Sequence, residues 1–307
     1  RDWSSDVCSS DLVRTDEGRC YDCKVKGNFR LRGIRSTNPV AVGDRVRIAP
    51  QPDGHSALIE DILDRRNYII RRASNLSKQS HIIAANVDQA VLLVTISHPE
   101  TSTTFIDRFL ASAEAYRVPV LLIFNKTDLY DAEERARLDA LCTLYSGLGY
   151  TSLACSVLQG EGLDPVREAL CGRVSLLSGN SGVGKSTLLN ALLPEAEART
   201  AEISAAHDSG MHTTTFSQMF FLPEGGALID TPGIKGFGTF DMQREEVAHY
   251  FREIFSTGSR CRFGNCTHTH EPECAVRVAV DEGRIAPSRY ISYLSMLEDY
   301  EEEKYRR

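Results

Sequence analysis

Residues 179–186 read Gly-Asn-Ser-Gly-Val-Gly-Lys-Ser, which is the spacing of a phosphate-binding loop. The small residues let successive backbone N–H groups turn toward a phosphate, and the dipole of a following helix adds to the attraction. We expect the Lys185 ammonium to bridge the β- and γ-phosphates and the Ser186 hydroxyl to bind Mg²⁺. The predicted contact residues are Gly179, Asn180, Ser181, Gly182, Val183, Gly184, Lys185, Ser186 and Thr187.

Residues 125–128 read Asn-Lys-Thr-Asp and could recognise a guanine base. Guanine presents N1–H and N2–H₂ side by side, and one carboxylate, here Asp128, accepts both hydrogen bonds. Adenine has no such pair of donors, which disfavours the alternative of an ATP-using enzyme. Asn125 can reach the N7/O6 side, the Lys126 stem can pack over the ring, and the backbone around Ser156 could contact O6. The predicted base-binding residues are Asn125, Lys126, Thr127, Asp128 and Ser156.

The order of these two segments is informative. In an ordinary GTPase the phosphate loop opens the domain and the base-reading tetrapeptide comes near its end. Here residues 125–128 precede residues 179–186. The order therefore predicts a circularly permuted GTPase.

A third segment, Asp230-Thr-Pro-Gly, could complete the phosphate site. We expect Asp230 to hold Mg²⁺ through a water and the Gly233 N–H to meet the γ-phosphate. Residues 204–215 show little periodicity, as expected for a mobile switch loop. One of its threonines, Thr213 or Thr214, should coordinate Mg²⁺; the alternative is that the threonine run begins an ordinary strand.

Ras-like enzymes orient the attacking water with a glutamine after the D-x-x-G turn, but this chain has Ile234 at that position. Isoleucine cannot hydrogen-bond a water. His212 is the best replacement in the neighbourhood. The alternatives are that His212 is a solvent-facing side chain, or that a partner supplies the missing group.

Residues 261–274 offer three thiolates and an imidazole, from Cys261, Cys266, His268 and Cys274. Zinc favours four such ligands in a tetrahedron, and a closed set implies a structural role. His270 is an alternative nitrogen ligand, and disulfides are the alternative chemistry. We predict one structural Zn²⁺ per chain, in addition to Mg²⁺ bound with GTP.

Strand and helix signals alternate over residues 85–240. Apolar runs at 90–95 and 119–124 read as buried strands, and residues 105–116 have helical spacing between them. Each nucleotide-binding segment comes directly after an apolar run. This pattern predicts a parallel α/β sheet with its ligand at the carboxyl ends of the strands.

Residues 13–65 carry short alternating runs, including 29–32, 45–48 and 57–62, which indicate a small barrel of the oligonucleotide-binding type. Residues 13–72 hold 13 Lys+Arg against 8 Asp+Glu, whereas the whole chain has a net charge of -7. Alternation would place Arg45 and Arg47 on the outer face, where they could contact phosphates; a charge-blunted edge strand is the alternative.

Residues 1–12 do not continue this strand pattern, and we interpret them as a spurious translated segment. Cys20-x2-Cys23 has no partner motif and reads as barrel packing.

Residues 241–307 look helical outside the cysteine cluster, and apolar residues at 290, 291, 294, 297 and 300 predict a last helix. The predicted domains are an N-terminal barrel at 13–72, a permuted GTPase domain at 73–240 and a zinc-binding helical domain at 241–307.

Taken together, these motifs resemble the RsgA (YjeQ) family of small-ribosomal-subunit-dependent GTPases. The resemblance also includes the segment Pro39-Val-Ala-Val-Gly-Asp44 and the segment Phe105-Ile-Asp-Arg108. It implies a multi-domain protein with an oligonucleotide-binding barrel, a permuted GTPase domain and a C-terminal zinc domain. It also implies a switch histidine, here His212, and GTP hydrolysis that is stimulated by the small ribosomal subunit late in its maturation.

The implied partners are GTP, GDP, and the small ribosomal subunit with its rRNA. No apolar run reaches the ~18–20 residues that span a bilayer, and no secretory signal is evident, so we expect a cytoplasmic protein, without a membrane partner, that acts as a monomer. A nucleotide-gated rRNA-binding module with incidental hydrolysis is the competing function. One hypothesis is that nucleotide state sets the angle between the barrel and the zinc domain.

Overall fold

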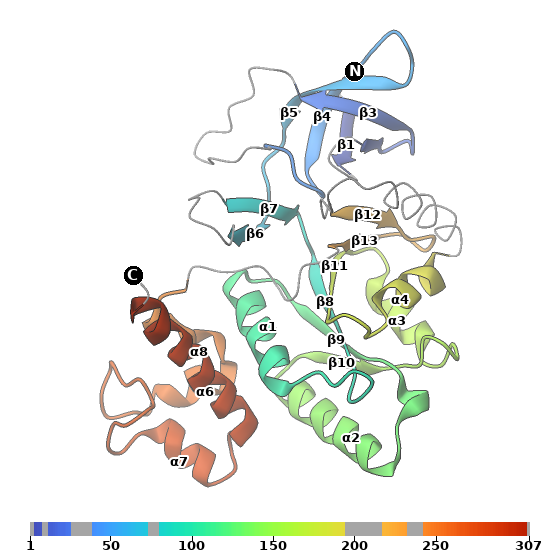
Figure 1. The fold of residues 1–307 in the computed structure, drawn as a ribbon. Coiled ribbons are helices and arrows are strands. Elements are labelled where there is room, and N and C mark those ends of the chain that lie inside the picture. The colour runs from blue at the N-terminus through green and yellow to red at the C-terminus, as the bar shows by residue number, and fades with distance from the viewer. Residues whose placement is uncertain are drawn as a thin grey trace.

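The computed structural model describes residues 3–7, 12–25, 39–72, 80–193, 217–231 and 242–305. Three units follow one another along the chain: a barrel, an α/β sheet with helices on both faces, and a group of C-terminal helices (Figure 1). This order confirms the predicted architecture. No described helix is long and apolar enough to cross a membrane.

Five strands close the N-terminal barrel in the order β1-β2-β3-β5-β4. Alternate side chains point inward because side chains of a strand alternate between its faces, and Val46, Ile48 and Ile59 are among the buried ones. The strands are β1 Trp3–Val7, β2 Leu12–Thr15, β3 Cys20–Val25, β4 Arg45–Pro50 and β5 Ser56–Ile62.

Strand β1 lies within residues 1–12, where the sequence predicted no strand. Its backbone pairs with β2 on one side and β4 on the other and so closes the barrel. Backbone groups pair whatever the side chains are, which explains why the side-chain pattern was uninformative. The interpretation of residues 1–12 as a spurious segment stays a prediction. The predicted strand at residues 29–32 lies outside the described residues.

Arg45 and Arg47 are partly exposed on the outer face of β4, as predicted. The alternative of an edge strand is wrong, because β4 pairs with both β1 and β5. Each arginine has an acidic neighbour, with Arg45–Asp16 at 2.9 Å and Arg47–Asp61 at 3.5 Å.

The interpretation of the Cys20–Cys23 pair as barrel packing holds for one residue of the two. Cys23 is buried inside the barrel, but Cys20 is exposed. Residues three positions apart in a strand face opposite sides, so the pair could not share one environment.

A two-stranded ribbon, β6 Tyr68–Arg72 and β7 Ser80–Ala85, lies between the barrel strands and the large sheet in the order of the chain. The predicted domain boundary at residue 72 falls between β6 and β7, which pair with each other, and it stays a prediction. The segment 39–44 packs beside this ribbon: the Ala85 N–H donates to the Val42 carbonyl at 2.8 Å. A buried Asp44–Arg65 ion pair at 2.6 Å fixes the same segment.

The central sheet has six strands in the order β10-β9-β8-β11-β13-β12, and all neighbours are parallel except the β12–β13 pair. Strands β8 and β9 are buried along their whole length, as expected when helices cover both faces. The strands are β8 Gln89–Val94, β9 Val120–Phe124, β10 Thr151–Ala154, β11 Val174–Ser178, β12 Gln218–Phe221 and β13 Ala227–Asp230.

Two helices cover each face of this sheet. Helices α1 (Thr103–Ala115) and α2 (Ala132–Gly147) pack on one face, where they share a core with Leu92 and Leu122. Helices α3 (Leu163–Leu170) and α4 (Lys185–Leu192) pack on the other. The short 3-10 helix η1, Thr127–Leu129, follows β9.

The C-terminal unit contains η2 Arg244–Tyr250, α6 Arg252–Gly258, α7 Ala275–Asp281 and α8 Pro287–Tyr305. The predicted last helix is confirmed, and Leu294 and Leu297, two of its predicted apolar positions, pack into the core of this unit. Ile291 is 59% exposed, whereas the polar residues Arg289 and Ser292 are fully buried. Their partners lie on helix α1, far away in sequence, and the periodicity of α8 alone could not reveal them.

Candidate nucleotide site and metal centre

The phosphate loop connects β11 to α4 and cannot carry larger residues at its glycines. Gly184 has φ +105°, and a Cβ there would lie 2.5 Å from Asn125 Nδ2. A Cβ on Gly179 would lie 2.4 Å from the Leu93 carbonyl oxygen. Lys185 Nζ donates to the carbonyls of Gly179 and Asn180, both at 2.7 Å. These contacts fix the loop at the N-terminus of α4, where backbone N–H groups and the helix dipole attract a phosphate.

Asn125 joins the base-reading loop to the phosphate loop. Its side chain is 3% exposed, and Nδ2 donates to the Val183 carbonyl at 2.9 Å. The Val157 N–H donates to Asn125 Oδ1 at 3.0 Å. Both ends of the amide are thus engaged by the protein, which gives Asn125 a role in holding three loops together.

Ser156 reaches the base-reading carboxylate through its hydroxyl. Ser156 Oγ is buried and donates to Asp128 Oδ1 at 2.5 Å. The sequence predicts a contact between the backbone around Ser156 and guanine O6. The Ser156 hydroxyl orients the Asp128 carboxylate. The contact with guanine O6 stays a prediction. 

The loop between β8 and α1 also borders this site, although the sequence analysis did not single it out. Lys126 has φ +68°, and its ammonium donates to the His98 carbonyl at 2.5 Å. Pro99 Cδ would lie 3.4 Å from a Cβ on Gly182. The Tyr130 hydroxyl donates to the Asn125 carbonyl at 2.5 Å and accepts from the Ile96 N–H at 2.8 Å. The only sequence signal for this loop was its place after an apolar run.

Asp230 ends strand β13 next to Lys185. Burial raises the pKa of the Asp230 carboxyl and lowers the pKa of the Lys185 ammonium, and the attraction between the two groups opposes both shifts. Asp230 Oδ1 is buried and has no hydrogen-bond partner among the described residues. A buried, unpartnered carboxylate oxygen is a suitable ligand atom for hydrated Mg²⁺. Ser186, in the first turn of α4, is exposed and available to the same ion.

Four predicted residues lie outside the described part of the chain: His212, Thr213, Thr214 and Gly233. The structure brings the other predicted nucleotide-binding segments together at the carboxyl ends of β9, β10, β11 and β13, where the parallel strands of an open α/β sheet bind ligands.

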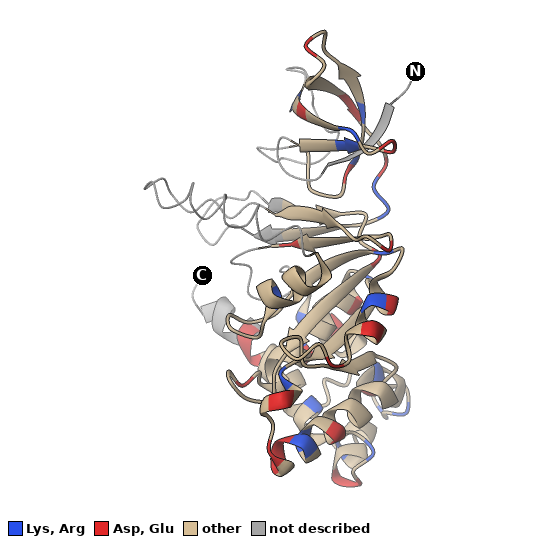
Figure 2. Cartoon of the chain, turned by 90° about the vertical axis from the view of Figure 1, so that its right-hand side faces the viewer, with Lys and Arg blue, Asp and Glu red and all other residues tan. Residues whose placement is uncertain are grey.

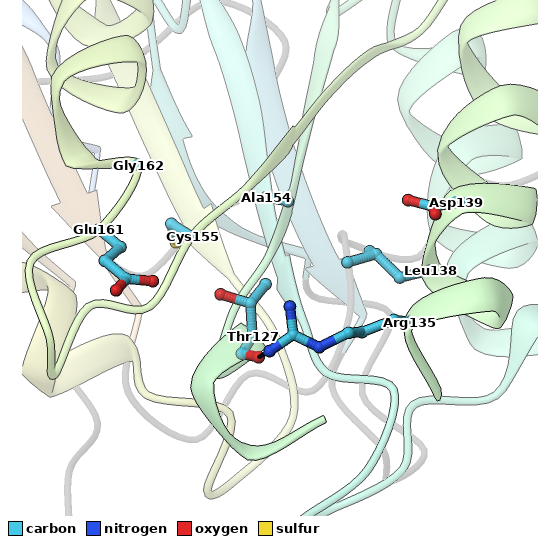
Figure 3. Close-up of a pocket in the computed structure, with 8 residues that line it drawn as sticks. All are labelled: Thr127, Arg135, Leu138, Asp139, Ala154, Cys155, Glu161 and Gly162. Carbon is cyan, nitrogen blue, oxygen red and sulfur yellow. Dashed lines mark hydrogen bonds between the residues drawn. The ribbon is translucent and has the colours of Figure 1, made fainter. Parts of the chain in front are cut away.

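A cavity of about 340 Å³ lies behind the base-reading loop (Figure 3). Arg135 of α2 crosses it and donates to the carbonyls of Thr127 at 3.2 Å and Tyr130 at 3.1 Å. Arg135 therefore supports the loop from the side of α2.

The cysteine cluster is assembled as predicted. The ligand atoms of Cys261, Cys266, His268 and Cys274 all lie within 4.8 Å of one another. Cys261 Sγ lies 3.9 Å from Cys274 Sγ, and both sulfurs lie 3.5 Å from His268 Nδ1. Two sulfurs bound ~2.3 Å from one metal ion in a tetrahedron lie roughly 3.8 Å apart, so these side chains could hold a metal ion. The described cysteines are free, which argues against the disulfide alternative.

Neighbouring groups hold the metal-binding loop in shape. Burial lowers the pKa of His268, which favours the neutral imidazole that a metal requires. The alternative ligand, His270, is exposed and interacts with Thr269 Oγ1. Glu271 accepts from the Thr267 N–H and hydroxyl, both at 2.6 Å. This arrangement selects His268 and not His270 for the cluster.

Comparisons with known proteins agree with this geometry. A family model described as RsgA GTPase matches residues 62–240, and one described as RsgA N-terminal domain matches residues 12–58. The chain is 66% identical over 294 residues to a Bacteroides fragilis protein named small ribosomal subunit biogenesis GTPase RsgA, covering 96% of this chain and 94% of the relative. It is 49% identical over 296 residues to the Christiangramia forsetii protein of the same name, with 96% and 94% covered.

Two solved structures share the whole fold. The crystal structure of YjeQ from Thermotoga maritima superposes with a TM-score of 0.78 at 36% identity, covering 97% of this chain and 98% of that one. The structure of YloQ, described as a circularly permuted GTPase, has a TM-score of 0.76 at 27% identity, covering 99% and 96%. The chain therefore belongs to the RsgA GTPase family and is a circularly permuted GTPase.

Proposed function

We propose that this protein hydrolyses GTP during the late maturation of the small ribosomal subunit, and that the subunit stimulates the hydrolysis. The observation that supports GTP as the substrate is a set of three contacts: Asn125 joins the base-reading loop to Val183 of the phosphate loop and to Val157, and Ser156 orients Asp128. The relatives named for small-subunit biogenesis support the choice of partner.

In the proposed site, Asp128 reads the guanine edge and the Lys126 stem covers the base. The phosphate loop and Lys185 bind the β- and γ-phosphates. Ser186 and Asp230, together with Thr213 or Thr214, would hold Mg²⁺, which neutralises phosphate charge during phosphoryl transfer. Gly233 would contact the γ-phosphate.

We further propose that the metal ion of the C-terminal cluster is Zn²⁺, one per chain, with a structural role. Three thiolates and one imidazole form a set typical of structural zinc, and its four ligands leave no open position for a substrate. We propose that the protein acts as a monomer in the cytoplasm, where its ribosomal partner would be found.

We propose His212 as the catalytic residue, because Ile234 replaces the usual glutamine. For His212→Ala we expect near-normal GTP binding and much slower turnover in the presence of small subunits. His55→Ala, an exposed histidine of the barrel, is the matched control. Full stimulated turnover in His212→Ala would remove the catalytic assignment.

GTP turnover measured with and without purified small ribosomal subunits tests the proposal as a whole. Stimulation is expected, and large subunits should give none. Equal turnover under all conditions would favour the alternative, a nucleotide-gated rRNA-binding module with incidental hydrolysis. Four of the basic residues that give residues 13–72 their positive net charge lie outside the described residues: Lys26, Arg30, Arg32 and Arg35. In the described chain, basic and acidic residues are interspersed (Figure 2).

A further inference from the structure

A buried ion pair connects the C-terminal unit to the GTPase domain. Arg289 Nη1 of α8 lies 2.8 Å from Asp107 Oδ1 of α1, and the two side chains are 1% and 0% exposed. The other oxygen of Asp107 accepts from Ser292 Oγ at 2.6 Å, and Tyr145 of α2 donates to Oδ1 at 2.9 Å. Arg289 Nε also reaches Glu253 of α6 at 2.6 Å. Four helices thus meet at one buried carboxylate and one buried guanidinium.

The next residue on α1 makes a second connection to α8. Arg108 Nη2 donates to the Ser295 carbonyl at 3.0 Å and to its hydroxyl at 2.7 Å, and Nη1 lies 2.5 Å from Asp299. Asp107 and Arg108 belong to the Phe105–Arg108 segment, which the nucleotide site does not use. We call the contacts of Asp107 and Arg108 with α8 the α1–α8 joint.

A buried ion pair contributes little net free energy to the packing of two helices. Desolvation offsets much of its attraction, and apolar residues of similar volume often stabilise a protein at least as well. What the pair adds is direction, because guanidinium and carboxylate hydrogen bonds accept only a narrow range of geometries. The joint therefore favours one orientation of α8 on α1.

The same helix α8 holds the metal-binding loop. The Tyr290 hydroxyl donates to the His268 carbonyl at 2.6 Å, and the Tyr293 hydroxyl donates to the Thr267 carbonyl at 2.8 Å. Residues 290 and 293 share one side of α8, while Arg289 and Ser292 share the adjacent side. A single helix thus carries the contacts to the metal loop and to α1.

Helix α1 begins at Thr103, shortly before Asp107, and its start lies next to the nucleotide site. Ser102 caps the helix, and residues 98 and 99 of the preceding loop contact Lys126 and Gly182. On the GTPase side, the residues that meet Arg289 and Ser292 therefore come from α1 and α2, which pack on one face of the sheet.

We propose that the α1–α8 joint makes the metal-binding unit a rigid extension of the GTPase sheet, so that its position is the same with GTP, with GDP and without nucleotide. Under this proposal, a nucleotide-dependent angle between the barrel and the zinc domain would require movement of the barrel. The proposal rests on the proposed function only for the identity of the nucleotides.

The distance between two spin labels tests this directly. One label replaces Val278 on α7, which is 45% exposed, and the other replaces Glu168 on α3, which is also exposed. The labels are introduced as unnatural amino acids because the chain holds nine cysteines. We expect the same narrow distance distribution with a nonhydrolysable GTP analogue, with GDP and without nucleotide. A shift of the main distance between these states would overturn the proposal.

Three variants test the joint itself. Asp107→Asn keeps the shape but removes the charge, and Arg108→Ala removes the second connection on the exposed side. Each should broaden the distance distribution, and the double variant should broaden it most, while metal content stays at the wild-type value. Arg284→Ala is the control, because its ion pair with Glu282 lies within the metal-binding unit.

An unchanged distribution in Arg108→Ala and in Asp107→Asn would refute the joint as the source of rigidity. If Asp107→Asn does not fold, Arg108→Ala alone decides, since Arg108 is 37% exposed and its loss leaves the buried pair intact. Binding of a fluorescent GDP is measured in parallel. Failure of the wild type to bind it would contradict the proposed function, whereas the variant comparison without nucleotide would still test the joint.

Discussion

Asn125 Nδ2 donates to the carbonyl of Val183 at 2.9 Å across 58 positions of sequence. One residue comes from the base-reading loop and the other from the phosphate loop. In this permuted chain the base-reading loop precedes the phosphate loop, the reverse of the order in an ordinary GTPase. The contact between Asn125 and Val183 nevertheless holds the two loops together. The nucleotide site therefore depends on the juxtaposition of its loops and not on their order along the chain.

Replacing Asn125 by alanine should weaken binding of GTP and GDP by about 10- to 100-fold. The substitution leaves the Val183 carbonyl and the Val157 N–H without partners, and each unsatisfied buried group costs ~1–3 kcal/mol. Titration with a fluorescent GDP measures the effect. Asn265→Ala, an exposed position in the C-terminal unit, should bind like the wild type. Wild-type affinity in Asn125→Ala would show that the loops do not need this connection.

Asp128→Asn should shift nucleotide preference from guanine to xanthine. The asparagine amide can accept from N1–H and donate to the C2 oxygen of xanthine, whereas in guanine its NH₂ would face the N2–H₂ group, which is also a donor. Competition between GDP and xanthosine diphosphate gives the ratio of affinities. Asp139→Asn, which changes an exposed carboxylate on the wall of the neighbouring cavity, serves as the control. Unchanged GDP affinity in Asp128→Asn would remove the base-reading assignment.

Gly184→Ala should abolish detectable nucleotide binding. The added Cβ would lie 2.5 Å from Asn125 Nδ2, and φ at this position is +105°, which an alanine rarely adopts. The control is Gly264→Ala, because a Cβ there meets nothing within 4 Å. Calorimetric titration with GDP compares the two. Tight binding by Gly184→Ala would mean that the phosphate loop is looser than its contacts indicate.

Purified protein should contain about one zinc ion per chain, and Cys274→Ser should lose it. Cys274 is buried between Cys261 and His268, and a hydroxyl is a much poorer zinc ligand than a thiolate. Elemental analysis measures the metal content directly. Cys171→Ser removes an exposed cysteine outside the cluster and should leave the zinc in place. A full zinc complement in Cys274→Ser would show that the ion, if present, is bound elsewhere.

The barrel should owe part of its stability to Asp53 in a pH-dependent way. Hydrogen bonds from the Ser56 hydroxyl, the Ser56 N–H and the His55 N–H lower the pKa of Asp53 to about 2. A lowered pKa means that the contribution is present above the ordinary carboxyl pKa of ~3.9 and is lost as pH falls toward about 2. Asp53→Ala should therefore lower the melting temperature at pH 6, and this difference from the wild type should vanish near pH 2. A difference that persists at pH 2 would contradict the assignment.

Sequence alone determined the chemistry of the nucleotide site and of the metal cluster. The phosphate loop, Asp128, Asp230 and the four metal ligands are short motifs in which residue type and spacing carry the function, because each motif must supply particular groups to one ligand. The same reasoning predicted the apolar strands of the sheet and the existence of helix α8, since periodicity reports how an element is buried.

Only the tertiary structure decided which groups join these motifs. Arg289 and Asp107 are 182 positions apart, and nothing in the local pattern of either helix indicates that the other is its partner. The same holds for Tyr130 and the residues of the loop before α1, and for β1, which pairs through its backbone. Such contacts depend on the packing of distant segments, and the free energy that selects a partner is a property of the folded chain and not of any one stretch of sequence.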